Sequence, residues 1–220
     1  MKKVLLLIIA SIFSFNTANA ADVTFGIGTN EAVFAAEGRE RNYDYAGSLE
    51  KTTVEYGAFK DKFLNAYVEV SNGVLGIGIN YIPSTISTPE NVNTQVQGGS
   101  SSADTKVSAD FDDWLTLYAI ARLPRFGLYL KAGMSQVDIN VKESGDVGTY
   151  NNTDSNGVTL GVGIEKMLDN GVGFRAEVSV YVFDDVTSSN GKAAGAADAN
   201  VVDVSDMYGA VGTISLLKRF

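Results

Sequence analysis

The segment Tyr208–Phe220, YGAVGTISLLKRF, alternates like a β-strand and ends on an aromatic residue. Counting back in twos from Phe220, one face is apolar except for one lysine and consists of Lys218, Leu216, Ile214, Gly212, Ala210 and Tyr208. The other face consists of Arg219, Leu217, Ser215, Thr213, Val211 and Gly209. A helix would repeat its apolar residues every three to four positions, whereas a strand repeats them every two. We therefore predict a final strand with one apolar face.

Short turns and long polar stretches divide the rest of the chain. Tight turns are predicted at Asn72-Gly73, near Pro124-Arg125, and at Asp169–Gly171. Four stretches rich in Ser, Thr, Asn, Gly and acidic residues are predicted as loops: Glu37–Thr53, Pro83–Asp113, Lys142–Asn156 and Asp184–Asp206. The strands between them are Asp22–Phe34, Val54–Ser71, Val74–Ile82, Trp114–Leu123, Gly127–Val141, Gly157–Leu168, Val172–Phe183 and Met207–Phe220. This alternation predicts an all-β fold, an eight-stranded antiparallel up-and-down transmembrane β-barrel with short periplasmic turns and long extracellular loops.

Each predicted strand has one nearly uncharged face, such as Leu115, Leu117 and Ala119, and one face that mixes charges with glycine. In a membrane barrel the apolar face contacts lipid, whereas a soluble ligand-binding barrel would turn it inward. Alternation alone cannot distinguish the two; the N-terminal segment, the terminal Phe and the one-sided loop lengths favour the membrane. The lumen would then hold a charge network: Glu69, Arg122, Lys131, Glu165, Arg175, Glu177 and Arg219.

The N-terminal segment has the features of a secretory signal peptide. Lys2 and Lys3 precede the apolar run Val4–Phe13, and Ala18-Asn19-Ala20 has the small-x-small form of a cleavage site. An anchor helix is the less favoured alternative, because spanning a bilayer takes about 20 apolar residues. Only helices and closed barrels satisfy the backbone in lipid. We predict cleavage after Ala20 and a single barrel domain at residues 21–220.

Composition excludes several kinds of chemistry. The chain has no cysteine and no histidine, which removes thiolate chemistry, histidine-ligated zinc and a Ser-His-Asp triad. Its formal net charge of −9 argues against nucleic acid as a partner. We expect no enzymatic activity, no cofactor and no metal centre.

Two constellations of charged residues remain as candidates. If Ile164 and Ala176 both face outward, the turn at Asp169–Gly171 has an odd length and Glu165 lies opposite Arg175. The lumen charges then form either a self-satisfied closed core, which we favour, or a small gated pore; carboxylate catalysis is the least favoured alternative.

The second constellation lies in the predicted loops, where Asp110, Asp112, Asp113, Asp184 and Asp185 could hold a divalent cation. Solvated loop charge is the favoured interpretation, because the spacing lacks the glycine and distal glutamate of a calcium loop. The same strand pattern predicts that Val70 lies opposite Leu75. It also places Trp114, Tyr81 and Tyr208 near strand ends, where an interfacial aromatic belt is expected. A carbohydrate-stacking surface is the less favoured alternative.

With these features in place, Asp22–Phe220 resembles the small eight-stranded outer-membrane barrels: the OmpA transmembrane domain, OmpX and the opacity proteins, often called porin-family. The resemblance implies Sec export to the outer membrane of a Gram-negative-type bacterium, periplasmic chaperones, and a barrel-assembly machinery that recognises the last strand. Its assembly signal would be Leu216, Lys218 and Phe220, with Lys218 departing from the usual aromatic or apolar residue.

The resemblance also bounds the function. The enzymes that share this architecture use histidine, which is missing here. We expect a monomer in outer-membrane lipid that acts through its extracellular loops, in surface recognition, adhesion or envelope integrity, on a ligand that the sequence does not name. The alternative is a narrow porin-like channel for small solutes.

Overall fold

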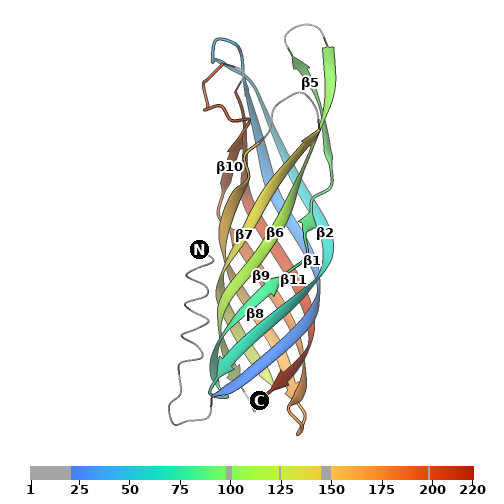
Figure 1. Cartoon of the computed structure of the whole chain (residues 1–220), viewed down its shortest axis with the longest axis vertical. Coiled ribbons are helices and arrows are strands. Elements are labelled where there is room, and N and C mark those ends of the chain that lie inside the picture. Colours follow the sequence, from blue (N-terminus) through green and yellow to red (C-terminus); the bar gives the residue numbers. More distant parts are fainter. Residues whose placement is uncertain (1–20, 98–100, 124, 145–149, 198) are drawn as a thin grey trace.

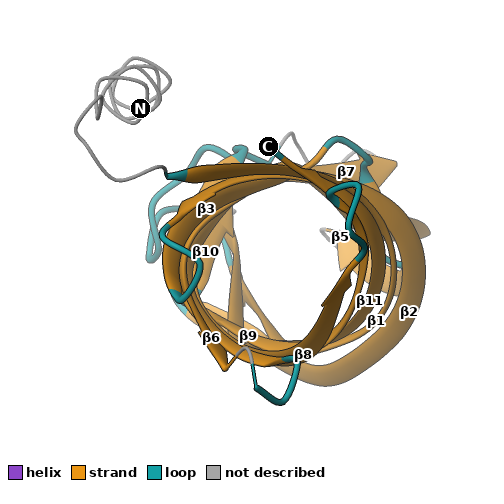
Figure 2. Ribbon diagram, turned by 90° about the horizontal axis from the view of Figure 1, so that it is seen from below, coloured by secondary structure: helices purple, strands orange, loops and turns teal. Residues whose placement is uncertain are grey.

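The computed structural model describes residues 21–97, 101–123, 125–144, 150–197 and 199–220, so the predicted signal peptide at residues 1–20 lies outside the described residues. Long antiparallel strands form a ring (Figures 1 and 2), in the order β1 (Asp22–Tyr43), β2 (Leu49–Ser71), β3 (Leu75–Ile82), β6 (Ser101–Leu123), β7 (Leu128–Ser144), β8 (Thr153–Met167), β9 (Val172–Phe183) and β11 (Asn200–Arg219). In the described part of the chain, no helix has the length and apolar character needed to cross a membrane.

The last strand closes the ring, as predicted. β11 pairs with β9 on one side and with β1 on the other. At the lower end in Figure 1, the Phe220 N–H donates to the carbonyl oxygen of Val23 at 2.9 Å. Closure removes the sheet edge that could not be tolerated in lipid. The fold is an eight-stranded antiparallel β-barrel.

The two faces of the strands are also as predicted. Outward side chains are widely exposed, for example Val178 at 61% and Ile214 at 67%. Inward side chains are buried, including Tyr129 at 1% and the charged Glu69 at 0%. The exposed aliphatic residues form a belt around the barrel, which is the surface that a transmembrane barrel presents to lipid.

The prediction of four long loops was wrong for much of their length. β1 and β2 continue together through Glu37–Asn42, paired with Lys51–Tyr56. Three short strands lie in the other stretches: β4 (Ile86–Ser87) and β5 (Asn91–Gln97) pair with β6, and β10 (Val186–Ser189) pairs with β11. Above the belt both faces of a strand can meet water, so a strand there needs no apolar face. The barrel wall therefore extends beyond the belt at the end opposite the short turns (Figure 1).

This extended wall is interrupted on one side. β2 pairs with β3 only from Ala66 to Ser71. Among the described residues, the longer part of β2, Leu49–Asn65, pairs with β1 alone, because β4 and β5 lie along β6 instead. The free edge begins at Asn65, beside the outward Leu64. The first charged outward residue, Lys62, follows two positions beyond Leu64, and its Nζ lies 3.6 Å from Glu31 Oε2. The interruption therefore starts at the upper border of the apolar belt.

The turn after β2 differs from its prediction by two residues. Val70 pairs with Ile77 rather than with Leu75. The Asn72 N–H donates to the Leu75 carbonyl, so the two central residues of the turn are Gly73 and Val74. Gly73 has a φ of 86°, as the first central residue of a type II′ turn does. A shift of two residues conserves the faces, and the outward residues were still assigned correctly.

The turn between β8 and β9 has the predicted three residues. The Leu168 N–H donates to the Val172 carbonyl, and Gly171 has a φ of 76°. The register that follows places Glu165 opposite Arg175, as predicted.

Candidate functional site

The inward side chains change character along the barrel, and β2 shows the order. Starting from the short turn, its inward residues are the buried Ser71, Glu69, Tyr67, Asn65 and Phe63, followed by the half-buried Asp61 and Phe59. β9 repeats the sequence from Arg175 to Phe183. The lumen therefore has a charged base, a layer of amides and hydroxyls, an aromatic layer, and an apolar outer part.

Glu69 is the centre of the charged base. Its carboxylate accepts hydrogen bonds from Arg175 Nη1 at 2.6 Å and Nη2 at 2.9 Å, from Arg122 Nη2 at 2.5 Å, and from the Tyr118 hydroxyl at 2.9 Å. All four side chains are almost fully buried. A buried carboxylate with this many charge-assisted donors has its desolvation cost offset by its partners.

Glu165 connects the same arginines to the end of the chain. It accepts from Arg175 Nη2 at 2.5 Å, from Arg122 Nε at 3.2 Å and from Arg219 Nη2 at 2.5 Å. Arg219 also donates from Nε to the Thr24 hydroxyl at 3.2 Å, so it joins β11 to β1 inside the lumen. The three ion pairs of Glu165 join β8 to β6, β9 and β11, and these four strands are not all neighbours in the ring.

The remaining acid and base form a separate pair. Lys131 donates to Glu177 Oε1, which also accepts from the Ser179 hydroxyl at 2.5 Å. Glu177 Oε2 accepts from the Tyr129 hydroxyl at 2.7 Å. The structure thus brings all seven lumen charges predicted from the sequence into two ion-paired clusters: Glu69, Glu165, Arg122, Arg175 and Arg219; and Glu177 with Lys131.

Tyrosine rings fill the space between the clusters. The Arg175 guanidinium carbon lies 4.9 Å from the ring centroids of both Tyr67 and Tyr129. Each ring faces a glycine on the neighbouring strand: Tyr67 pairs with Gly26, and Tyr129 with Gly163. A β-carbon at either glycine would overlap the ring, so the inward glycines make room for tyrosine.

Above the charges lies a layer of amides. Asn30 Nδ2 donates to Asn65 Oδ1 at 2.9 Å, Asn65 Nδ2 donates to Asn80 Oδ1 at 2.5 Å, and the Thr213 hydroxyl donates to Asn30 Oδ1 at 2.6 Å. The cavity around this layer is bounded by Trp114 and Tyr181 on one side and by Lys131, Arg175 and Glu177 on the other, and it has a volume of about 20 Å³. That is space for about one water molecule.

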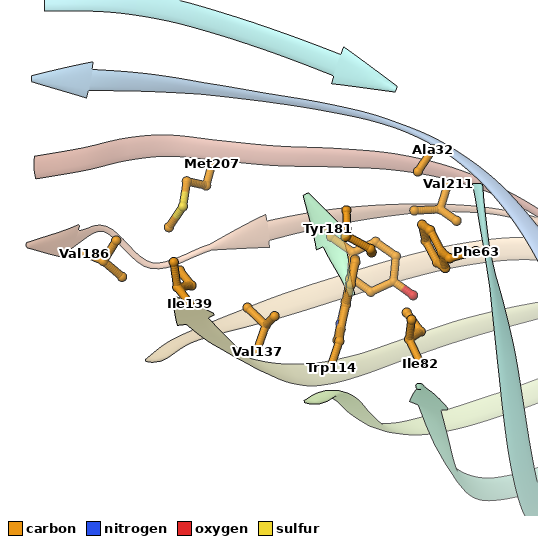
Figure 3. Close-up of a cluster of buried hydrophobic side chains, with 11 residues drawn as sticks. Ala32, Phe63, Ile82, Trp114, Val137, Ile139, Tyr181, Val186, Met207 and Val211 are labelled. Carbon is orange, nitrogen blue, oxygen red and sulfur yellow. The ribbon is translucent and has the colours of Figure 1, made fainter. Parts of the chain in front are cut away.

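Trp114 occupies the middle of the aromatic layer, and its prediction as a belt residue was wrong. It is 3% exposed, and its ring centroid lies 4.9 Å from that of Tyr181 and 6.0 Å from that of Phe63 (Figure 3). The ring centroid of Phe183 lies 5.4 Å from that of Trp114. Tyr81 and Tyr208 do face outward. The aromatic layer closes the lumen above the amides.

Beyond Trp114 the lumen opens into a cavity of about 500 Å³. We call this cavity the apolar cup, and its lining includes Phe34, Phe59, Trp114, Ile139, Phe183 and Met207. The sequence pattern does not predict it, because the strand extensions that form its wall lie in polar stretches whose composition indicates loops.

Two β-bulges explain how apolar residues reach the cup. Phe111 and Trp114 on β6 are three positions apart, yet both pack into the inner cluster, and the register shifts between them at Asp113, whose φ is 50°. β11 repeats the device: Val204 and Met207 both face inward across a shift at Asp206, whose φ is 51°. An extra residue in a bulge returns the next side chain to the same face. Apolar residues three apart around an aspartate, D-F-D-D-W and V-S-D-M, are the signal that could have revealed the cup.

The acidic residues near the outer rim have local partners. Asp110 pairs with Lys142 and accepts from the Ser87 hydroxyl at 2.8 Å, and the hydrogen bond from Lys142 lowers the pKa of this carboxyl. Asp112 accepts from Thr85 and Asn140, at 2.5 and 2.7 Å.

No cluster of acidic residues suited to a metal ion occurs within the described ranges. The predicted divalent-cation alternative therefore has no support from the geometry of Asp110, Asp112, Asp113, Asp184 and Asp185.

No protein-family model and no curated protein matches this chain. Its backbone is similar to the crystal structure of the outer membrane protein OprG from Pseudomonas aeruginosa, with a TM-score of 0.55 and 15% sequence identity over 92% of this chain and 97% of that one. The fold is that of an outer-membrane β-barrel. At this identity the likeness extends to the fold alone.

Two other solved structures are more distant. Ail, the attachment invasion locus protein of Yersinia pestis, solved in complex with the heparin analogue sucrose octasulfate, has a TM-score of 0.41 and 10% identity over 87% of this chain and 99% of that one. The outer membrane protease OmpT from Escherichia coli has a TM-score of 0.44 and 8% identity over 93% and 99%.

Proposed function

We propose that this protein is a non-conducting, non-catalytic outer-membrane barrel that acts on the extracellular side, in surface recognition, adhesion or envelope integrity. One observation carries the proposal: the free space inside the barrel falls from a cavity of about 500 Å³ in the outer part to a cavity of about 20 Å³ beneath the aromatic layer. Below that point the space is filled by ion pairs and tyrosine rings. What remains accessible is the extended outer wall and the apolar cup.

The ion pairs make opening costly. A solute path through the base would have to separate Glu69 from Arg122 and Arg175, all almost fully buried. Removing one partner of a buried pair typically costs about 3–5 kcal/mol, because the other charge is left uncompensated. The closed state is therefore the stable one.

The same contacts argue against catalysis. Glu69, Glu165 and Glu177 each accept hydrogen bonds from at least two groups, so none is poised as a free acid or base beside a cavity of substrate size. The proposal also includes export by Sec with cleavage after Ala20 and a monomeric state. It further includes recognition of Leu216, Lys218 and Phe220 during assembly, which the pairing of the last strand with β1 supports.

Planar-bilayer recording tests the closed lumen. We expect no discrete openings from the wild-type protein, because the base is filled. Arg175→Ala removes the central guanidinium of the network, so any channel openings should appear in this variant first. Lys166→Ala, on the exposed outer face, is its control and should remain silent. Heat-modifiable migration on SDS gels shows that each sample is folded. Discrete wild-type openings that change in Arg175→Ala would contradict the proposal and favour the narrow channel.

A further inference from the structure

A long stretch of strand edge is free above the apolar belt. Between Leu49 and Asn65, β2 pairs with β1 on one side, and no described strand pairs with its other side, because β4 and β5 lie along β6 (Figure 1). The backbone N–H and carbonyl groups of such an edge can pair with a strand from another chain. The structure therefore offers a site for an extended segment on the extracellular side.

The charges along this edge are self-complementary. Each end has an acid followed directly by a base: Glu50 and Lys51 at the upper end, Asp61 and Lys62 at the lower end. When the segment is laid antiparallel to a second copy with Tyr56 at the centre, Glu50 lies opposite Lys62. Lys51 then lies opposite Asp61. The two-fold symmetry of such a pair repeats both contacts, and directly opposite residues of unlike charge stabilise a sheet.

Neighbouring registers lack this match. A slip by one residue places Lys51 opposite Lys60 in one direction and opposite Lys62 in the other, so like charges meet. A slip by two residues brings Glu55 opposite the same residue of the second copy in one direction. In the other direction it leaves every charged residue of the segment without an opposite charge. The charges therefore select the register centred on Tyr56.

The four charged residues are available for this pairing. Glu50 and Lys51 are exposed and make no ion pair or side-chain hydrogen bond within the described residues. Lys62 contacts Glu31 at 3.6 Å, but both side chains are mostly exposed, so this contact contributes little. Asp61 Oδ1 accepts from the backbone N–H of Lys62 at 2.7 Å, which leaves Oδ2 for a second donor.

The edge discriminates between partners. Lysine on a strand edge usually discourages pairing with other chains, and this edge carries Lys60 and Lys62. A second copy meets Lys62 with Glu50 and leaves Lys60 opposite the neutral Thr52, so it avoids the repulsion. At the centre Tyr56 is 80% exposed, and the two-fold axis places it opposite the same ring of the second copy, where an aromatic pair adds to the contact.

The two-fold axis also decides how the two barrels are placed. For antiparallel strands of one sheet, this axis runs perpendicular to the sheet. The sheet here is the barrel wall, so the axis lies parallel to the membrane plane and reverses the direction of the second barrel. The second copy therefore approaches with its extracellular end first, from a facing membrane.

From these observations we propose that the free edge of β2 binds the same edge of a second copy in a facing membrane, in the antiparallel register centred on Tyr56. Within its own membrane each barrel stays a monomer. The inference rests on the proposed function and deepens it, because it names the partner through which the extracellular wall acts in adhesion.

Disulfide cross-linking tests the register, because the chain has no cysteine of its own. Tyr56→Cys is reconstituted in phosphatidylcholine vesicles and oxidised with copper phenanthroline. The register places the two cysteines directly opposite each other, within the reach of a disulfide. Ala58→Cys, on the same strand and face, is the control, because its two copies lie four positions apart along the pair. We expect at least about tenfold more cross-linked dimer from Tyr56→Cys.

A mixed experiment tests the facing membranes. Thr52→Cys and Lys60→Cys are reconstituted in separate vesicle populations. These two positions lie opposite each other in the proposed register, whereas neither lies opposite itself. We expect a cross-linked dimer only after the two populations are mixed, and neither population alone should give it. The pair also repeats the test of the register if Tyr56→Cys does not fold by the heat-modifiability criterion.

A charge exchange tests the complementarity, with the Tyr56→Cys dimer as the readout. Lys51→Asp and Asp61→Lys each place like charges opposite each other and should lower the yield at least about tenfold. The double variant, Lys51→Asp with Asp61→Lys, restores opposite charges and should recover the yield. The two single variants change the net charge in opposite directions, so loss in both is not an effect of net charge.

The proposal is overturned if folded Tyr56→Cys gives no more dimer than Ala58→Cys, if the mixed vesicles give no dimer, or if the double variant fails to recover the yield. These outcomes are separable from the closed lumen. Silent bilayers without cross-linking would remove the pairing of β2 alone, whereas discrete bilayer conductance with register-specific cross-linking would remove the closed lumen and keep the pairing.

Discussion

Glu69→Gln is expected to lower the free energy of unfolding by about 3–5 kcal/mol, the cost of leaving a buried charge without its partner. Glu69 is fully buried and is the shared acceptor of Arg122 and Arg175. The amide keeps the size of the side chain but presents one acceptor oxygen instead of two and carries no charge. Two buried guanidiniums then depend on Glu165 alone. The measurement is urea unfolding from lipid vesicles, followed by the fluorescence of Trp114.

Glu31→Gln is the matched control. Glu31 pairs with Lys62 at 3.6 Å, but both side chains are mostly exposed. Exposed pairs contribute about 0–1 kcal/mol, so the control should unfold close to wild type. If Glu69→Gln also unfolds within about 1 kcal/mol of wild type, the charged base is not the buried network that we describe.

Val162→Arg is expected to lower the free energy of unfolding in vesicles by about 2–4 kcal/mol, the cost of an arginine at the lipid-facing midplane of a barrel. Val162 faces outward on β8 and pairs with Leu130 and Val178, which are also outward and exposed. Val54→Arg is the control, because Val54 is 44% exposed on the part of β2 above the belt, where an arginine meets water and a change within about 0.5 kcal/mol is expected. Equal effects of the two substitutions would mean that the aliphatic belt does not contact lipid.

The faces of the strands could be predicted from the sequence because the membrane imposes them. Between Tyr208 and Phe220 every second residue must suit lipid, so the period of two persists to the end of the chain, and the strand that closes the barrel is readable. The position of Glu165 opposite Arg175 followed from the same parity and from one short turn.

The outer wall could not be predicted in this way, because water imposes no such period. Residues such as those of Glu37–Asn42 pair along β2 through their backbones while their side chains meet solvent, so nothing in their polarity distinguishes a strand from a loop. The sequence pattern also does not specify which side chains donate hydrogen bonds to Glu69. They come from β6 and β9, across the lumen, and a local pattern does not specify contacts across the barrel.

The apolar cup was missed for a third reason. Bulges at Asp113 and Asp206 break the alternation that assigns faces, so Phe111 and Trp114 share a face although their spacing is odd. Because tryptophan is enriched at membrane–water interfaces, Trp114 at a predicted strand end indicated an interfacial aromatic residue. An aspartate in the left-handed region is tolerated more readily than most residues, which is why these bulges use it.

The measurement that tests the transmembrane barrel most directly is a spin-label scan of β11. The protein has no native cysteine, so single cysteines at positions 210–216 can be labelled one at a time in bilayer-reconstituted protein that shows heat-modifiable migration. The structure predicts high oxygen accessibility, typical of acyl chains, at Ala210, Gly212, Ile214 and Leu216, and low accessibility at Val211, Thr213 and Ser215. A uniform profile, the opposite phase, or access of a water-soluble relaxation agent to the four outward positions would contradict a barrel whose aliphatic face lies in lipid.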